Sequence, residues 1–371
     1  MTTGGFDGRA FPTTLADLDA SWLNRTLHES GALAGGEKVV GFEALPLGEG
    51  FGMLGFLARL MLRYEHGTGS LQSVIFKCAT ASTGNRAVAA AFDMYQRELS
   101  FYRLLASDLP DMVPVCHAAT YDPSGDFALL LEDLSDYRRG DQAAGCGVGD
   151  ARLCVDTLGV LHSRWWDRVD DALLDWVPRP DGDMYKLGMV AGVKAGWDRT
   201  VATFGHLLPD ELAAAGPRYL AGLPALHDRM SSGHQTFLHG DFRLDNLLFG
   251  AAGDDRPLIL VDWQGCIVSK STQDLAYFLT QNVTTDVRRE HETDLVRRYH
   301  QGLLDHGISG YSLDECWEDY RLAALWLWEY AVVIAGTLDP ANERGVAFMA
   351  GLVERAASSI MDLDLLQLLA P

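Results

Sequence analysis

Apolar residues follow two different periods along this chain. Residues 39–47, 56–65 and 73–80 are short apolar runs of the kind that forms strands. Two further runs, residues 113–122 and 127–134, flank a Pro-Ser-Gly turn and predict a hairpin. The first third of the chain is therefore expected to form a small antiparallel sheet.

Helical spacing interrupts these strands and then takes over. Residues 13–31 predict a short amphipathic helix with Thr14 as a candidate N-cap, and residues 86–107 predict one longer helix. Its apolar stripe consists of Val88, Phe92, Tyr95, Leu99, Tyr102 and Leu105. After a glycine-rich loop at 137–149 the chain is mostly helical, over residues 151–169, much of 171–236, 273–282, 286–306 and 313–369. The pattern predicts an α+β protein with two domains, residues 1–133 and 134–371.

Polar residues break two apolar segments of the second domain in an ordered way. Residues 237–250 contain His239-Gly240-Asp241, and Asn246 follows Asp241 after four residues. The apolar run at 258–261 leads into Asp262. The same spacing occurs in protein kinases, where the Asp takes the acceptor's proton and the Asn and a later Asp hold metal. The alternative is ordinary turn chemistry, because Asp and Asn favour loops.

These residues, with Asp262-Trp263-Gln264 and the Asp-Leu-Ala-Tyr-Phe run at 274–278, resemble the aminoglycoside phosphotransferase and choline kinase-like superfamily. The motif sequence, with Gln264 two residues after Asp262, is most similar to that of the ecdysteroid kinase-like branch of this superfamily. Gly240 stands where protein kinases have Arg, as in small-molecule kinases. The resemblance implies a protein kinase-like fold with two lobes: a small antiparallel-sheet lobe with one key helix, and a larger helical lobe.

The resemblance also implies roles for particular residues. Asp241 would be the catalytic base, and Asn246 and Asp262 would bind Mg²⁺. The nucleotide, ATP or GTP, would be bound by residues of the first lobe and of the crossover that follows it: Gly50, Gly52, Lys77, Glu98, Glu132 and Leu134. In this set Lys77 binds phosphate and Glu98 orients it, while the backbone at Glu132 and Leu134 meets the adenine edge.

Lys77 and the glycines also have simpler interpretations. Lys77 is the only charge in residues 73–80, and a buried ammonium needs a partner such as Glu98. The alternative is an edge-strand lysine whose amine reaches water. Gly50, Gly52 and Gly55 suit a phosphate-binding turn but equally a plain hairpin. A dinucleotide fold would require a helix directly after them, whereas residues 56–65 alternate like a strand.

Several other polar or aromatic residues have a structural alternative. We expect His162 to be a satisfied core histidine, His239 to support its loop by a hydrogen bond, and Asp274 either to cap a helix or to tie down the catalytic loop. An aromatic group in the last helices suits either an acceptor pocket or core packing: Trp317, Tyr320, Trp326, Trp328 and Tyr330.

Composition narrows the class of protein. The chain has 371 residues, 48% of them hydrophobic, and a formal net charge of −21. This acidity argues against nucleic-acid binding and suits either solubility or the attraction of a cationic acceptor. We find no membrane-spanning run and no secretory signal, so we expect a cytoplasmic protein that does not bind membranes, a monomer or homodimer. The six cysteines lack metal-ligand spacing and are expected to be free thiols.

The expected function is transfer of the γ-phosphate of ATP or GTP to a hydroxyl of a small-molecule acceptor. Candidate acceptors are an aminoglycoside or other antibiotic, which would confer antibiotic resistance, an amino sugar, or a steroid-like alcohol. The alternative is a catalytically silent nucleotide- or ligand-binding protein on the same fold. A dinucleotide-dependent oxidoreductase would rest on Gly50, Gly52 and Gly55 alone.

Overall fold

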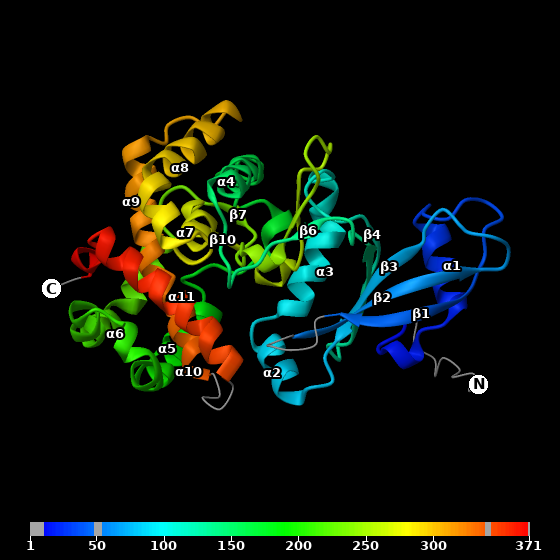
Figure 1. Ribbon diagram of the computed structural model, residues 1–371, viewed down its shortest axis with the longest axis horizontal. Coiled ribbons are helices and arrows are strands. Elements are labelled where there is room, and N and C mark those ends of the chain that lie inside the picture. Colours follow the sequence, from blue (N-terminus) through cyan, green and yellow to red (C-terminus); the bar gives the residue numbers. More distant parts are fainter. Residues whose placement is uncertain (1–10, 48–53, 338–342, 370–371) are drawn as a thin grey trace. The chain divides into compact units, whose positions relative to one another are not determined.

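The computed structural model describes residues 11–47, 54–337 and 343–369 (Figure 1). The chain divides into two compact units, residues 1–137 and 138–371. The division follows Tyr137, whereas the sequence interpretation placed it after Asp133.

The first unit is built on one five-stranded sheet. Its strands are β1 (Val39–Leu47), β2 (Gly55–Tyr64), β3 (Ser73–Ala79), β4 (Cys116–Tyr121) and β5 (Phe127–Glu132). They lie in the order β1-β2-β3-β5-β4, and every neighbouring pair is antiparallel. All five strands were predicted. Because β3 lies in the middle of the sheet, Lys77 is on a central strand and the edge-strand interpretation is wrong.

Side chains on β3 divide between the two faces of the sheet. Val74, Phe76 and Cys78 belong to a buried cluster that also contains Trp22, from helix α1 (Ala20–Glu29). Alternate residues of a strand point to opposite faces, so Lys77 points away from this cluster. The apolar face thus fixes the direction in which the lysine points.

Two helix predictions in the first unit need correction. The predicted helix at 13–31 begins later, at Ala20, because the Asp19 side chain accepts a hydrogen bond from the Trp22 N–H and caps it. Thr14 is an N-cap as predicted, but of a separate 3₁₀ turn, Leu15–Asp17, where it forms a capping box with Asp17. The predicted helix at 86–107 is two helices, α2 (Thr83–Ala91) and α3 (Met94–Leu104).

The break between α2 and α3 lies at Asp93, whose φ of +48° is left-handed. Because the chain changes direction there, Val88 does not share a face with the later stripe residues and is exposed. Tyr95, Leu99, Tyr102 and Leu105 are buried as predicted.

The second unit is dominated by helices, as predicted. They are α4 (Val148–Ser163), α5 (Asp183–Phe204), α6 (Asp210–Met230), α7 (Thr272–Gln281), α8 (Thr285–Asp305), α9 (Leu313–Trp326), α10 (Trp328–Thr337) and α11 (Glu343–Asp362). Figure 1 shows α7 lying among α4, α8, α9 and α11. All ten residues of α7 are buried, so this helix is the centre of the unit.

Five short strands hold the loops of the second unit. β7 (Thr236–Leu238) pairs with β10 (Ile267–Ser269), while β8 (Leu247–Phe249) pairs with both β6 (Arg138–Arg139) and β9 (Leu258–Leu260). Residues 239–246 connect β7 to β8, and Asp262 follows β9 within two residues. These pairings bring the predicted catalytic segments together at the strand ends.

The aromatic group of the last helices is mainly core. Tyr320, Trp326 and Trp328 are almost completely buried, which favours packing over an acceptor pocket. All six cysteines are free thiols, as expected. Over the described ranges, we find no helix both long and apolar enough to cross a bilayer.

Candidate active site

The first unit contains a buried ion pair. Lys77 Nζ lies 2.9 Å from Glu98 Oε1 and 2.7 Å from Oε2, and the side chains are only 7% and 2% exposed. Gly55, opposite Ala79, lies beside them, and a Cβ there would approach Lys77 Cε to 3.1 Å. The predicted pairing of Lys77 with Glu98 is therefore present. Because a buried ion pair contributes little net stability, stability alone does not account for it.

The remaining predicted nucleotide contacts are less informative. Gly50 and Gly52 lie outside the described residues. Glu132 ends β5, and its side chain accepts a hydrogen bond from the Val115 N–H at 3.0 Å. Leu134 is buried, and its carbonyl accepts from the Tyr137 N–H at 3.0 Å. Binding of phosphate by the glycines and binding of the adenine edge by the backbone at Glu132 and Leu134 both stay predictions.

In the second unit, residues 239–246 form a loop that we call the 239–246 loop. The Asn246 side-chain amide donates to the Asp241 carbonyl at 3.0 Å and to Asp241 Oδ2 at 2.9 Å. Asn246 is 3% exposed, whereas the Asp241 side chain is 24% exposed. The loop thus fixes an accessible carboxylate by means of a buried amide, and the Asn246 oxygen is the atom that can bind a metal.

Asp262 lies close to this pair. The Val261 N–H donates to the Asn246 carbonyl at 3.0 Å, and Asp262 is the next residue. Its φ of +67° is left-handed, which is uncommon for a residue with a Cβ and is typical of functional sites. The Gln264 side chain donates to Asp262 Oδ2 at 3.3 Å.

The donor atoms suit a hard cation. No group of three or more His, Cys, Asp and Glu side chains within the described ranges could hold a metal ion. The carboxylate of Asp262 and the amide oxygen of Asn246 are oxygen donors on two segments that the Val261–Asn246 backbone hydrogen bond joins. Mg²⁺ is usually held by one or two carboxylates together with phosphates and water, so this set fits it.

Two glycines allow the catalytic segments to approach each other. Gly240 has a φ of +77°, and a Cβ there would lie 2.0 Å from the Gly265 carbonyl oxygen. A Cβ at Gly265 would lie 3.0 Å from the Asp241 Cβ. Only glycine fits at position 240, which gives a steric reason for the residue that distinguishes this loop from the protein kinase sequence.

Asp274 ties the loop to helix α7. Its Oδ2 accepts from the His239 N–H at 2.8 Å, and its Oδ1 accepts from the Gly240 N–H at 2.9 Å. His162 Nδ1 lies 2.7 Å from the Tyr299 hydroxyl and Nε2 lies 3.4 Å from Asp274 Oδ2. Of the two roles expected for Asp274, the loop tether is confirmed, and His162 is a satisfied core residue.

His239 supports the loop rather than facing solvent. Its Nδ1 accepts from the Asp241 N–H at 3.3 Å, which leaves Nε2 to donate to the Val261 carbonyl at 3.0 Å. One neutral tautomer therefore satisfies both bonds. The side chain joins the 239–246 loop to the segment that carries Asp262, as the predicted supporting role requires.

Arg243 is a site residue that the sequence interpretation missed. Its guanidinium lies beside the carboxylates of Asp241 and Asp245 and is 29% exposed. Burial would lower the pKa of Arg243, but the negative charges of Asp241, Asp245 and Asp262, and of Tyr277 when ionised, raise it. A basic residue between two acidic residues of the motif was the available signal.

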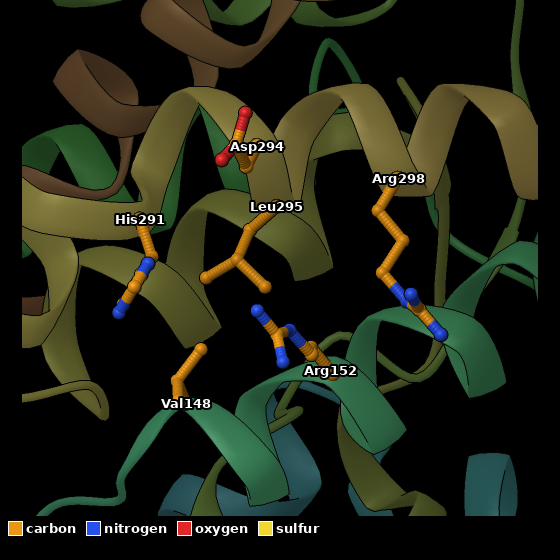
Figure 2. A pocket seen from close by; sticks show the side chains of 6 residues that line it. All are labelled: Val148, Arg152, His291, Asp294, Leu295 and Arg298. Carbon is orange, nitrogen blue, oxygen red and sulfur yellow. The ribbon is translucent and has the colours of Figure 1, made fainter.

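One cavity lies elsewhere in the second unit. It has a volume of about 180 Å³ between α4 and α8, and Figure 2 shows its six lining residues: Val148, Arg152, His291, Asp294, Leu295 and Arg298. None of the predicted site residues lines it. One lining residue, Arg298, is also paired with Asp156 at 2.6 Å.

Comparison with known proteins confirms the resemblance. Residues 189–308 match the ecdysteroid kinase-like family, and this segment includes Asp241, Asn246 and Asp262. No curated protein sequence matches the chain significantly.

Solved structures show the same fold. One, assigned as an aminoglycoside phosphotransferase from Ralstonia eutropha JMP134, superposes with a TM-score of 0.56 at 14% identity, covering 95% of this chain and 99% of that one. The GDP complex of an aminoglycoside 2'-phosphotransferase-IIIa variant gives a TM-score of 0.54 at 13% identity, covering 93% and 99%. The predicted protein kinase-like fold is confirmed.

Proposed function

We propose that this protein is a small-molecule kinase that transfers the γ-phosphate of ATP or GTP to a hydroxyl group. The proposal rests chiefly on the 239–246 loop, in which Asn246 fixes Asp241 beside Asp262. The paired Lys77 supports it, because an ammonium group that a buried carboxylate holds in one orientation is suited to binding phosphate oxygens. The GDP found in a similar structure supports use of a purine nucleotide.

In the proposed reaction, the acceptor hydroxyl oxygen forms a bond to the γ-phosphorus. The bond from that phosphorus to the bridging oxygen breaks, and the nucleoside diphosphate leaves with the electron pair. Asp241 orients the hydroxyl and takes its proton, since a carboxylate within hydrogen-bond reach is a suitable base. Asn246 and Asp262 would hold Mg²⁺, which neutralises phosphate charge when bound. Lys77, oriented by Glu98, would bind phosphate oxygens.

The acceptor is a small hydroxylated molecule, with aminoglycosides and other antibiotics, amino sugars and steroid-like alcohols as the classes to test. Similarity in this fold follows the phosphate chemistry more closely than the acceptor. A screen of such compounds for coupled release of nucleoside diphosphate would identify the class.

The test of the base is Asp241→Asn. We expect it to lower turnover by about 10³-fold or more while Mg-nucleotide affinity stays within about threefold, because the carboxylate acts on the proton in transit. Isothermal titration with Mg-ADP and Mg-GDP and a coupled assay measure the two effects. Full turnover in the variant would refute the assignment of Asp241. Binding without any turnover by the parent protein, across the acceptor screen, would instead identify a catalytically silent binding protein.

A further inference from the structure

Arg243 is held between two carboxylates of the 239–246 loop. Its Nε donates to Asp241 Oδ2 at 3.2 Å, and a terminal nitrogen donates to Asp245 Oδ2 at 3.1 Å. The other Asp245 oxygen accepts from the Gln142 N–H at 3.2 Å. Asp245 is therefore fixed from two sides, and the guanidinium is fixed against the candidate base.

This contact places the guanidinium close to the proposed chemistry. A base lies about 3 Å from the hydroxyl whose proton it takes. The hydroxyl oxygen in turn lies about 3–3.5 Å from the phosphorus before transfer. A cation that touches Asp241 is consequently within a side chain's reach of the transferred phosphoryl oxygens.

The negative charge around the site favours such a cation. Asp241, Asp245 and Asp262 are three acidic residues around the site, and a transferred phosphoryl group brings further negative charge. Like charges would repel the base and the phosphoryl group at the moment of transfer. A guanidinium is permanently charged, planar and able to bind phosphate through two N–H groups at once.

We propose that Arg243 is a catalytic residue whose guanidinium contacts the phosphoryl group in transit. This inference rests on the proposed kinase function. In the transfer step the acceptor oxygen–phosphorus bond forms and the bridging bond breaks, as above. Arg243 exchanges no proton; it neutralises the equatorial oxygens and screens them from Asp241.

The competing interpretation is that Arg243 only braces the loop. The two differ in what they predict for a mimic of the phosphoryl group. A brace affects the folded state in every ligand condition, whereas a phosphoryl contact affects only those states in which a phosphoryl-like group is present. Aluminium fluoride added to Mg-ADP or Mg-GDP supplies such a planar mimic without any need to know the acceptor.

The experiment compares thermal shifts of the full chain with Mg-ADP or Mg-GDP, with and without aluminium fluoride. In the parent protein we expect fluoride to add to the stabilisation by the diphosphate. In Arg243→Gln we expect the thermal shift caused by the diphosphate to persist, but the additional shift caused by aluminium fluoride to disappear. We expect turnover to be about 10²-fold lower. Arg243→Lys should recover part of both. Arg139→Gln is the matched control, because Arg139 donates to the Asp245 carbonyl at 3.0 Å but forms no hydrogen bond or ion pair with Asp241.

Each result assigns Arg243 one role. A full fluoride increment and turnover within about twofold in Arg243→Gln would overturn the proposal. If Arg243→Gln and Arg243→Lys both lose the thermal shift with the diphosphate and the circular dichroism of the folded protein, Arg243 only braces the loop. If the parent protein binds neither Mg-diphosphate, the kinase function itself fails, and this inference fails with it.

Discussion

At the scale of single residues, the candidate site depends on a glycine, Gly240, where a residue with a Cβ would not fit. The Gly240 amide donates to Asp274 while its α-carbon packs against the Gly265 carbonyl. A side chain at 240 would separate the two segments that carry Asp241 and Asp262. The glycine therefore positions the base although it has no chemical group of its own.

We predict that Gly240→Ala destabilises the protein by about 3 kcal/mol or more, because the new Cβ would meet the Gly265 oxygen at 2.0 Å in a left-handed conformation. Gly310→Ala is the control. Gly310 has a similar φ, +81°, but open space around it, so only the conformational cost of about 1–2 kcal/mol should appear. Urea unfolding measures both. Equal losses in the two variants would show that the close approach to Gly265 is unimportant.

At the scale of elements, α7 connects the core of the second unit to the 239–246 loop. Asp274, in its first turn, is completely buried and accepts two backbone N–H groups from that loop. Buried backbone N–H groups without acceptors cost free energy. The two hydrogen bonds to Asp274 therefore hold the 239–246 loop in a fixed position relative to α7. The position of Asp241 thus depends on how helix α7 packs in the second unit.

We predict that Asp274→Asn lowers stability by about 2–3 kcal/mol and turnover by about 10- to 100-fold. An asparagine offers one acceptor oxygen where two N–H groups need acceptors, and a small displacement of the base is costly in rate. Asp286→Asn is the control, because Asp286 occupies the first turn of α8 but is exposed. Unfolding and coupled assays should find this control nearly unchanged. Turnover equal to that of the parent protein in Asp274→Asn would show that this tether does not control the position of Asp241.

The elements also show how far sequence reasoning reaches. The five strands, the helical second unit and the Lys77–Glu98 pair follow from periodicity and from the cost of burying one charge among apolar residues. The break at Asp93 does not, because a left-handed residue inside a helical pattern leaves the apolar spacing on either side intact. The ion pairs of Arg243 with Asp241 and Asp245 were missed for a related reason. Whether alternating charges in a loop contact one another depends on the backbone conformation of the loop, which their spacing does not give.

At the scale of the whole molecule, two electrostatic effects of salt oppose each other. Several exposed ion pairs, such as Arg138–Asp150 at 2.8 Å and Arg298–Asp156 at 2.6 Å, weaken when salt screens them. Each of these pairs contributes about 0–1 kcal/mol. The net charge of −21 acts in the opposite direction, since mutual repulsion of the excess acidic groups destabilises any compact state and salt relieves it.

We predict that the repulsion is the larger effect, so stability rises by on the order of 1 kcal/mol when sodium chloride increases from about 0.01 to about 0.1 M. Over this range the screening length falls from about 30 Å to about 10 Å, which removes interactions between distant charges while neighbouring ion pairs partly survive. Urea unfolding at each concentration measures the effect, and potassium chloride should give the same curve if screening rather than a specific ion is responsible. A fall in stability over this range would mean that the local pairs outweigh the excess charge, and that the acidity of this protein carries little cost to its fold.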